Sequence, residues 1–149
     1  MADVKTRKSV KPIIAKTQGQ PFTGKVVVLL DSDSGSAAEV FARVLQLEKR
    51  AIVIGDRSAG AVMRSLSHGL NMGADYLVFY GVSITNADVL MTDGQSLEHV
   101  GVVPDELLLP TGEQLAAKQD AVLARALYLA GARMDATKAG ALFPVEWKK

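Results

Sequence analysis

Apolar and polar residues divide the chain into segments with different periodicities. Residues 25–31 (KVVVLLD) and 51–55 (AIVIG) are aliphatic runs, rich in β-branched side chains and too short for helices. Both therefore predict strands that are buried on both faces. Between them, from Ser36 onward, apolar residues recur at helical spacing and stop at the charged residues 48–50 (EKR). This order predicts a βαβ unit with a parallel strand pair at the centre of an α/β sheet.

The flanking segments carry other patterns. Residues 1–24 are polar, basic and interrupted by proline and glycine, which predicts a flexible basic arm ahead of one domain at residues 25–149. Residues 62–91 contain short β-rich runs, YLVFYGVSIT and DVLM, separated by NMGAD and TNAD, and predict short strands of a mixed or antiparallel region. Residues 101–110 (GVVPDELLLP) predict one more extended segment.

Residues 111–131 predict a single amphipathic helix near the C-terminus that packs on the sheet. Thr111 and Gln114 fit a capping box at its start, and Gly131 fits a stop at its end. The apolar residues of one helical face are Val122, Leu123, Ala126, Leu127 and Ala130.

Composition narrows the class of protein. The chain has 149 residues, of which 48% are hydrophobic and 22% charged, with a net charge of +1, so we expect one globular core. The absence of cysteine excludes disulfides and thiolate chemistry. No apolar run approaches the roughly 20 residues of a membrane span, and the first residues lack the apolar centre of a signal peptide. The basic residues of the arm are interpreted as a solvated terminus, so no nucleic-acid partner is predicted.

No cofactor or metal site is predicted either. Asp31, Asp33 and Asp56 lie in turns, where aspartate hydrogen-bonds its own backbone, and their spacing matches no metal-ligand pattern. Gly55 and Gly60 are expected to serve the backbone, at a tight exit from a strand and a close approach of the chain to the site.

Residues 36–39 (SAAE) have two interpretations. Ser36 and Glu39 fit a capping box, in which the serine is simply the cap of a helix. However, Ser36 also lies at the carboxyl end of a predicted parallel strand and at the first turn of a helix, where α/β proteins bind ligands and where amides can stabilise an oxyanion. Ala38 replaces the second glycine of the G-x-S-x-G nucleophile motif. These residues alone leave both roles open.

Three segments in order resemble one family. Residues 26–46 (VVVLLDSDSGSAAEVFARVLQ), 51–62 (AIVIGDRSAGAV) and 93–105 (DGQSLEHVGVVPD) are similar to the carboxyl-terminal processing, or tail-specific, serine peptidases of family S41, which include the tricorn core. The tail LFPVEW, residues 142–147, fits as an extension. The resemblance implies a ClpP/crotonase-like α/β fold, a peptide or protein substrate, and a chain that is the C-terminal portion of a longer catalytic domain. Many relatives act outside the cytoplasm, but this sequence itself leaves the compartment open.

The resemblance also implies roles for individual residues. Ser36 matches the nucleophile, Glu39 matches a supporting acid, and the backbone amide of Ala37 becomes the candidate oxyanion donor. In the lysine-dependent branch a G-K-G motif supplies the base, and Ala61 stands at that position. Since alanine cannot take a proton, a Ser–Lys dyad is excluded at these positions.

The variant around Ala61 resembles two other branches, one with a histidine base and one of non-catalytic retinoid-binding relatives. In the histidine branch the base comes from upstream of the nucleophile strand, outside this chain segment. His68 and His99 do not match its position and are interpreted as ordinary polar residues. Glu98 falls where the family has an acid near the site, and it either orients an imidazole or is a solvated loop carboxylate.

Three hypotheses follow. The first is a serine peptidase that forms an acyl-enzyme on Ser36, with its general base supplied from outside this segment. The second is a catalytically inactive module that binds a peptide or a hydrophobic ligand, and the third is a crotonase-like acyl-thioester enzyme. If part of the domain lies outside this chain, we expect exposed apolar surface along residues 26–30 or on neighbouring strands, and self-association or aggregation.

Overall fold

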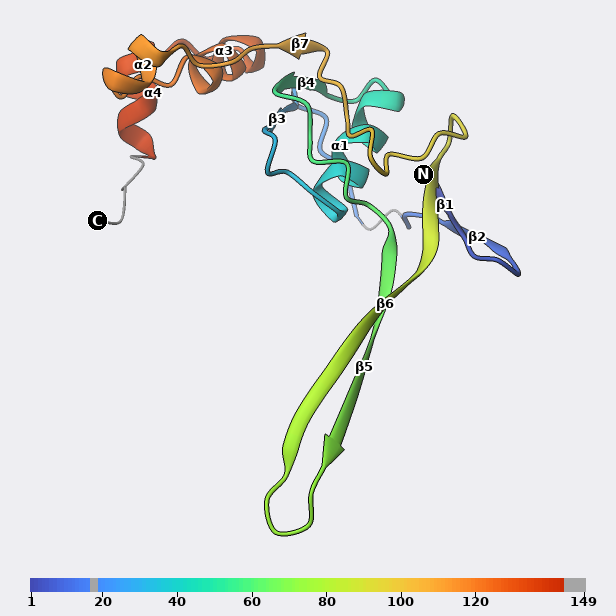
Figure 1. The fold of residues 1–149 in the computed structure, drawn as a ribbon. Coiled ribbons are helices and arrows are strands. Elements are labelled where there is room, and N and C mark those ends of the chain that lie inside the picture. The colour runs from blue at the N-terminus through green and yellow to red at the C-terminus, as the bar shows by residue number, and fades with distance from the viewer. Residues whose placement is uncertain (17–18, 144–149) are drawn as a thin grey trace.

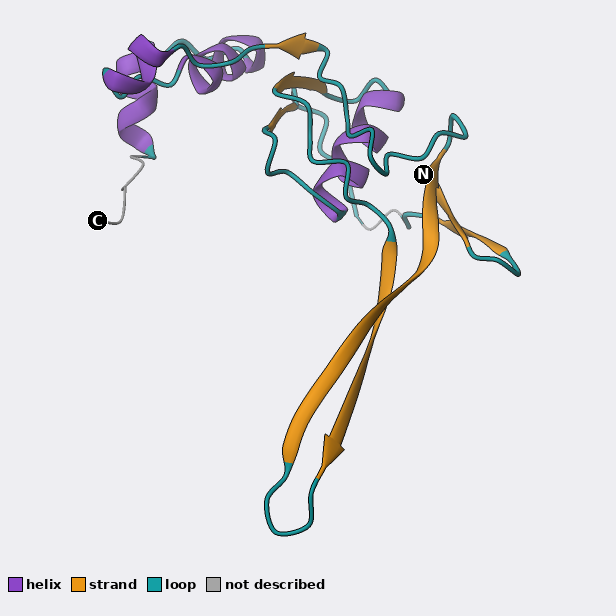
Figure 2. Ribbon diagram, in the orientation of Figure 1, coloured by secondary structure: helices purple, strands orange, loops and turns teal. Residues whose placement is uncertain are grey.

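The computed structural model describes residues 1–16 and 19–143. Figures 1 and 2 show a body of strands and helices from which one long β-hairpin projects. In chain order the elements are β1 (Ala2–Lys5), β2 (Val10–Ile13), β3 (Val27–Leu30), α1 (Ala37–Leu47), β4 (Ile52–Gly55), β5 (Arg64–Met72), β6 (Val78–Met91), β7 (Glu106–Leu107), α2 (Gly112–Ala116), α3 (Ala121–Ala130) and α4 (Ala136–Leu142).

The predicted βαβ unit is present. Strands β3 and β4 pair in parallel on either side of α1 in the sequence, and β7 adds to the other edge of β4, so the sheet order is β3-β4-β7. Val53 and Ile54 in the central strand are fully buried, as expected. The expectation of burial on both faces is wrong for β3, because this strand lies at the sheet edge and Leu29 is 43% exposed. The α/β fold class is confirmed.

The hydrophobic core lies where this unit meets the inner half of β6. Ala42 of α1 and Val53 of β4 are completely buried, and Val102 and Met91 are nearly so. Residues from four separate segments therefore share one apolar interior, and their burial stabilises the loops that follow β3 and β4.

The second sheet corrects the prediction of a flexible arm. Its order is β2-β1-β6-β5, all antiparallel, with Ala2 opposite Met91 and Ile13 opposite Ala2. Residues 2–13 thus form a hairpin closed by Thr6, whose N–H donates to the carbonyl of Ser9 at 2.8 Å. Four-residue strands are too short to be recognised by their periodicity, and the partner β6 is distant in sequence. Residues 17–18 of the expected arm lie outside the described residues.

The middle of the chain forms two long strands instead of several short ones. β5 pairs antiparallel with residues 78–87 of β6, which confirms the antiparallel alternative. TNAD was expected to separate two strands, yet residues 85–88 lie inside β6, because Asp88 pairs with Lys5 and Asn86 lies at a register shift beside Arg64. Tertiary pairing has overridden the polar composition of this segment.

The C-terminal region contains three helices, so the prediction of one helix over residues 111–131 is wrong. The capping box of Thr111 and Gln114 is confirmed at the start of α2, and Gly131 ends α3 with φ 102°. Between them the chain turns at Lys118, where φ is 54°, and Asp120 caps α3 by accepting from the Leu123 amide at 2.7 Å.

Helix α3 packs against β3 and β4, as expected for a helix that docks on the sheet. Helix α4, which the sequence pattern did not predict, packs against α3. Most of the expected LFPVEW extension, residues 144–147, lies outside the described residues. Within residues 1–16 and 19–143, no helix has both the length and the apolar character needed to cross a bilayer.

Candidate active site

Ser36 has an unusual backbone conformation. It follows β3 and precedes α1 with φ 57° and ψ −121°, whereas a helix N-cap normally has a negative φ. A non-glycine residue in such a region costs on the order of 1–3 kcal/mol and persists only when its surroundings hold it there. Two acceptors do so, because the Ser36 N–H donates to the carbonyl of Ala61 and to Oε2 of Glu39, both at 2.9 Å. The residue itself is exposed.

The capping box predicted from the sequence is present at the start of α1. Its well-formed half is the hydrogen bond from the Ser36 amide to the Glu39 carboxylate. The Ser36 hydroxyl makes no regular hydrogen bond to the helix terminus. The serine is thus held mainly through its amide, and it lies exposed at the carboxyl end of β3.

Glu39 is a fully buried carboxylate with four donors around it. Its Oε1 accepts from Ser58 Oγ at 2.6 Å and from the Gly60 amide at 2.7 Å, and its Oε2 accepts from the amides of Ser36 at 2.9 Å and Ala61 at 3.0 Å. Burial alone would raise the pKa of Glu39, but these hydrogen bonds outweigh it and hold the pKa below its ordinary value of 4.5. We call Glu39 and these four residues the Glu39 clamp.

The clamp fixes the loop after β4 against the loop before β7. Ser58 Oγ also accepts from the Val102 amide at 2.6 Å. Gly60 and Gly101 have φ of 70° and 71°, and a side chain on Gly101 would approach the Ser58 carbonyl at 2.4 Å. Sequence analysis missed Ser58 and Gly101, although the glycine between two valines in VGVV was a signal of close backbone approach.

The expectation for Gly55 and Gly60 is confirmed. Gly55 has φ 116°, and a Cβ there would lie 2.1 Å from the Leu30 carbonyl oxygen. A Cβ on Gly60 would lie 2.9 Å from the Gly101 amide nitrogen. Both positions therefore need glycine, one at the exit from β4 and the other where two loops touch.

Glu98 supports the same region from a third segment. Its Oε2 accepts from the amides of Val62 at 2.7 Å and Met63 at 2.9 Å, so it holds the chain directly after Ala61. Its Oε1 lies 3.9 Å from Nε2 of His99, whose imidazole is 90% exposed. His68 lies on exposed β5, opposite Val82. Both histidines are thus surface residues, as expected.

The structure gathers the predicted site residues at one edge of the parallel sheet. Ser36 follows β3, and Ala61 lies in the loop after β4. The carbonyl of Ala61 accepts a hydrogen bond from the Ser36 amide. These are the carboxyl ends of parallel strands, where α/β sheets bind ligands. Among the described residues, the Ala37 amide in the first turn of α1 has no hydrogen-bond acceptor. An amide in this position, next to an exposed hydroxyl, can receive a negatively charged oxygen.

The aspartates near the site serve their own turns. Asp31 Oδ1 accepts from Ser34 Oγ at 2.7 Å and from the Asp33 amide at 3.2 Å. Asp56 Oδ1 accepts from the Arg57 amide at 2.7 Å. Over residues 1–16 and 19–143, no three His, Asp or Glu side chains gather in a way that would hold a metal ion.

An exposed serine at the end of a parallel strand thus lies beside a buried carboxylate with four hydrogen-bond donors, and comparison with known sequences is more specific about the class of protein. The profile of peptidase family S41 matches residues 2–108. This is most of the chain, so the chain belongs to peptidase family S41. The resemblance seen in the sequence is confirmed, and family membership supports a peptidase function.

Two solved structures are similar. One, provisionally described as a peptidase from Parabacteroides merdae, has a TM-score of 0.67 and 24% identity over 88% of this chain and 42% of its own. The other, the photosystem II D1 C-terminal processing protease, has a TM-score of 0.57 and 25% identity over 73% of this chain and 27% of its own. The first shows the shared fold. The chain spans less than half the length of either protein.

Proposed function

We propose that this chain carries the nucleophile of a serine peptidase. The observation that carries the proposal is the backbone of Ser36, which the Glu39 clamp holds at φ 57° while the residue stays exposed. Strain of this kind is a feature of nucleophiles on sharp strand-to-helix turns. Membership of family S41 supplies the substrate class, a peptide or protein.

The proposed reaction has two stages. Ser36 Oγ attacks the carbonyl carbon of a peptide bond, its proton passes to a general base, and the negative oxygen is stabilised by the Ala37 amide. The C–N bond then breaks, the base returns the proton to the leaving amine, and an acyl-enzyme remains. Water attacks this ester with the help of the same base and releases the acid.

The general base is proposed to come from outside the described residues. Ala61 has no side chain that can take a proton, although it lies beside Ser36. Among the described residues, the Ser36 hydroxyl has no hydrogen bond to an imidazole or amine. We assign Glu98 the role of orienting an imidazole base, since its Oε2 is committed to the amides of Val62 and Met63 while its Oε1 makes no hydrogen bond with a described residue.

A second candidate function is a binding module that holds a peptide or a hydrophobic ligand without cutting it. The observation in its favour is again Ala61, because the position next to the serine lacks a base. The two candidates differ in the reactivity of one hydroxyl. A nucleophile with a base reacts with a fluorophosphonate, whereas an unassisted serine does not.

The test is fluorophosphonate labelling of the protein expressed from its complete reading frame, with the site identified by mass spectrometry. We expect one labelled residue, Ser36, and loss of labelling in Ser36→Ala. Ser32→Ala is the matched control, because Ser32 is an exposed serine in the turn after the same strand, and it should label normally. Absence of labelling in a folded protein that binds peptide would reject the peptidase and leave the binding module.

A further inference from the structure

The β5–β6 hairpin has one apolar face. In an antiparallel pair, residues opposite each other project to the same side. The rungs Leu66↔Ile84, His68↔Val82, Leu70↔Tyr80 and Met72↔Val78 share one side, and the rungs between them share the other. We call the first side the apolar hairpin face; it consists of Leu66, His68, Leu70, Met72, Val78, Tyr80, Val82 and Ile84. The other side carries Ser65, Ser67, Gly69, Asn71, Phe79, Gly81, Ser83 and Thr85.

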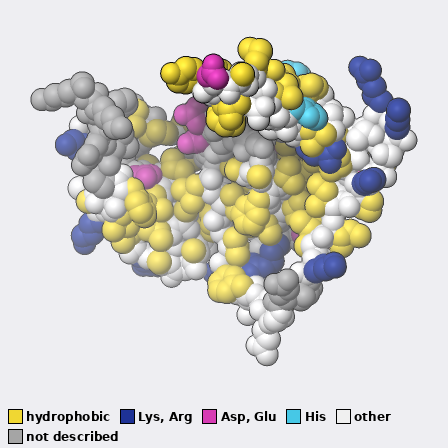
Figure 3. Space-filling view, turned by 90° about the horizontal axis from the view of Figure 1, so that it is seen from below, with side chains coloured by type: hydrophobic (Ala, Val, Ile, Leu, Met, Phe, Trp, Pro, Cys, Tyr) yellow, Lys and Arg dark blue, Asp and Glu magenta, His cyan; other side chains and the backbone are white. Residues whose placement is uncertain are grey.

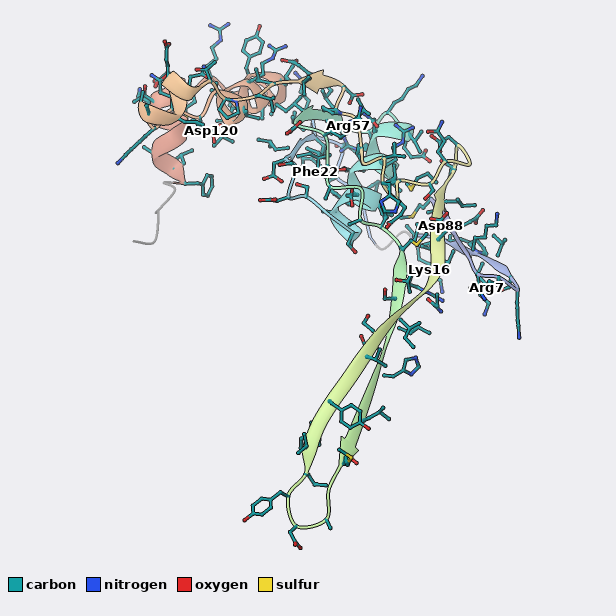
Figure 4. All side chains as sticks on the ribbon, in the orientation of Figure 1. Arg7, Lys16, Phe22, Arg57, Asp88 and Asp120 are labelled. Atoms are coloured by element: carbon teal, nitrogen blue, oxygen red, sulfur yellow. The ribbon has the colours of Figure 1, made fainter. Side chains whose placement is uncertain are left out.

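No described element covers this face. Its apolar side chains are between 45% and 65% exposed. Figure 4 shows the side chains of the outer hairpin standing clear of the body, in which Phe22 and Arg57 are labelled. Figure 3 looks from below, along the hairpin, and shows hydrophobic side chains spread over this side of the molecule. Among the described elements, β5 packs extensively only against β6.

The apolar face continues the core side of β6. In the inner half of this strand the buried residues are odd-numbered, Ala87, Val89 and Met91. In the outer half of β6, the residues on the apolar hairpin face are even-numbered, from Val78 to Ile84. A register shift between Arg64 and Ser65 places an extra residue on β6, which moves the alternation by one position. The bulge therefore keeps the apolar side chains on one side, as expected of a surface that is buried in the working protein.

A two-stranded ribbon with one exposed apolar face is not stable in water by itself. Seven apolar side chains, each about half exposed, present roughly 600 Å² per copy, and doubling this reaches the size of a specific protein–protein interface. Exposed apolar patches of this size mark interaction sites. Some surface must cover the face.

We propose that a second copy of this chain covers it, with two apolar hairpin faces packed against each other about a two-fold axis. The face is self-complementary, because none of its eight residues is Lys, Arg, Asp or Glu, and its only ionisable groups are those of His68 and Tyr80. A two-fold axis places each face against itself, so a charge would meet a like charge, and this face has almost none.

The two edges of the antiparallel sheet support this choice. At one edge, β2 is four residues long and contains Lys11 and Pro12, which hinder edge-to-edge pairing of copies. At the other edge, β5 is nine residues long and contains neither lysine nor proline. The β5 edge therefore lacks the lysine and proline that hinder pairing at β2, and its one Lys, Arg, Asp or Glu residue, Arg64, is the first residue of the strand.

The test is sedimentation velocity of the protein from its complete reading frame over a wide concentration range. We compare Val82→Lys with Ser83→Lys, because these neighbours on β6 are both exposed and project to opposite faces. Wild type and Ser83→Lys should be dimers. Val82→Lys should raise the dissociation constant at least about 100-fold, since a lysine from each copy would be buried in the interface.

Leu70→Lys, on the other strand but on the same face, should dissociate the dimer like Val82→Lys, and circular dichroism checks that the variants are folded. A monomeric wild type overturns the proposal. If Val82→Lys then lowers the melting temperature of that monomer, a segment of the same chain covers the face. A dimer that both lysine variants on the apolar hairpin face leave intact also overturns it, because another surface must then mediate association.

Discussion

The Glu39 clamp and the outer half of the β5–β6 hairpin differ in whether their side chains find partners within the described chain. Around Glu39, a buried charge has four donors, and among the described residues no buried side-chain nitrogen or oxygen lacks a hydrogen-bond partner. In the hairpin the strands pair with each other, but the apolar face has no cover. The clamp is therefore complete within the described chain, whereas the hairpin depends on a surface outside it. Substitutions should affect the two regions very differently.

The largest effect is expected for Glu39→Gln. The amide of glutamine has one acceptor oxygen where the carboxylate has two. Its NH₂ group is a donor, and it would face groups that also donate, either those of Ser58 and Gly60 or those of Ser36 and Ala61. We expect the free energy of unfolding to fall by about 3 kcal/mol and fluorophosphonate labelling of Ser36 to disappear. Urea denaturation and labelling measure the two quantities. Unchanged stability together with full labelling would contradict the assigned role of the clamp.

A matched pair of truncations compares the regions directly. Val53→Ala, at a fully buried position, should destabilise the protein by about 2 kcal/mol. Val82→Ala, at a position 48% exposed, should cost the monomer less than about 0.5 kcal/mol. Denaturant titration at several protein concentrations sharpens the comparison, because the cost at Val82 should grow with concentration if a second copy covers it.

The pH dependence of stability should report the clamp. The folded pKa of Glu39 lies below its ordinary value of 4.5, so its contribution to stability is present above that pH. It is lost as the pH falls through the folded pKa, because the neutral acid no longer accepts from all four donors. Thermal melts between neutral and acid pH should show a loss below about pH 4.5 that is smaller in Glu39→Gln. Equal slopes in both proteins would contradict this assignment.

A modest, salt-dependent effect is expected for Asp93→Asn. Asp93 Oδ2 accepts from Arg43 at 2.6 Å and ties the end of β6 to α1, with both side chains about a quarter exposed. Burial raises the pKa of Asp93, but the hydrogen bonds from Arg43 and from the Gln95 amide, together with the charge of Arg43, outweigh it and lower the pKa. Loss of this pair should cost about 1 kcal/mol, and less in high salt. A salt-independent cost would show that hydrogen-bond geometry and not charge dominates.

Some features of the fold and site could be predicted from sequence alone. Continuous aliphatic runs around a helical pattern gave the parallel pair β3 and β4, and the position of Ser36 at the end of β3 followed directly. The role of Glu39 was predicted only as a supporting acid. Its actual partners, Ser58, Gly60 and Ala61, come from a loop about twenty residues further along the chain, and no local pattern identifies such contacts.

The errors of prediction have a common cause. The sequence predicts an arm where β1 and β2 lie because four-residue strands have no periodicity of their own, and these strands exist because β6 pairs with β1. Residues 111–131 were taken for one helix because the apolar spacing continues across the break at Lys118, where the backbone turns to a positive φ.

The sequence by itself determined the βαβ unit, the helix caps and the place of the exposed serine, because these depend on hydrogen bonds and side-chain spacing within a few residues. Only the tertiary structure decided the partners of β6, the four donors on Glu39 and the exposure of the apolar hairpin face. These features depend on contacts between segments that are distant in the sequence. The packing of the shared core decides those contacts, and no local pattern does.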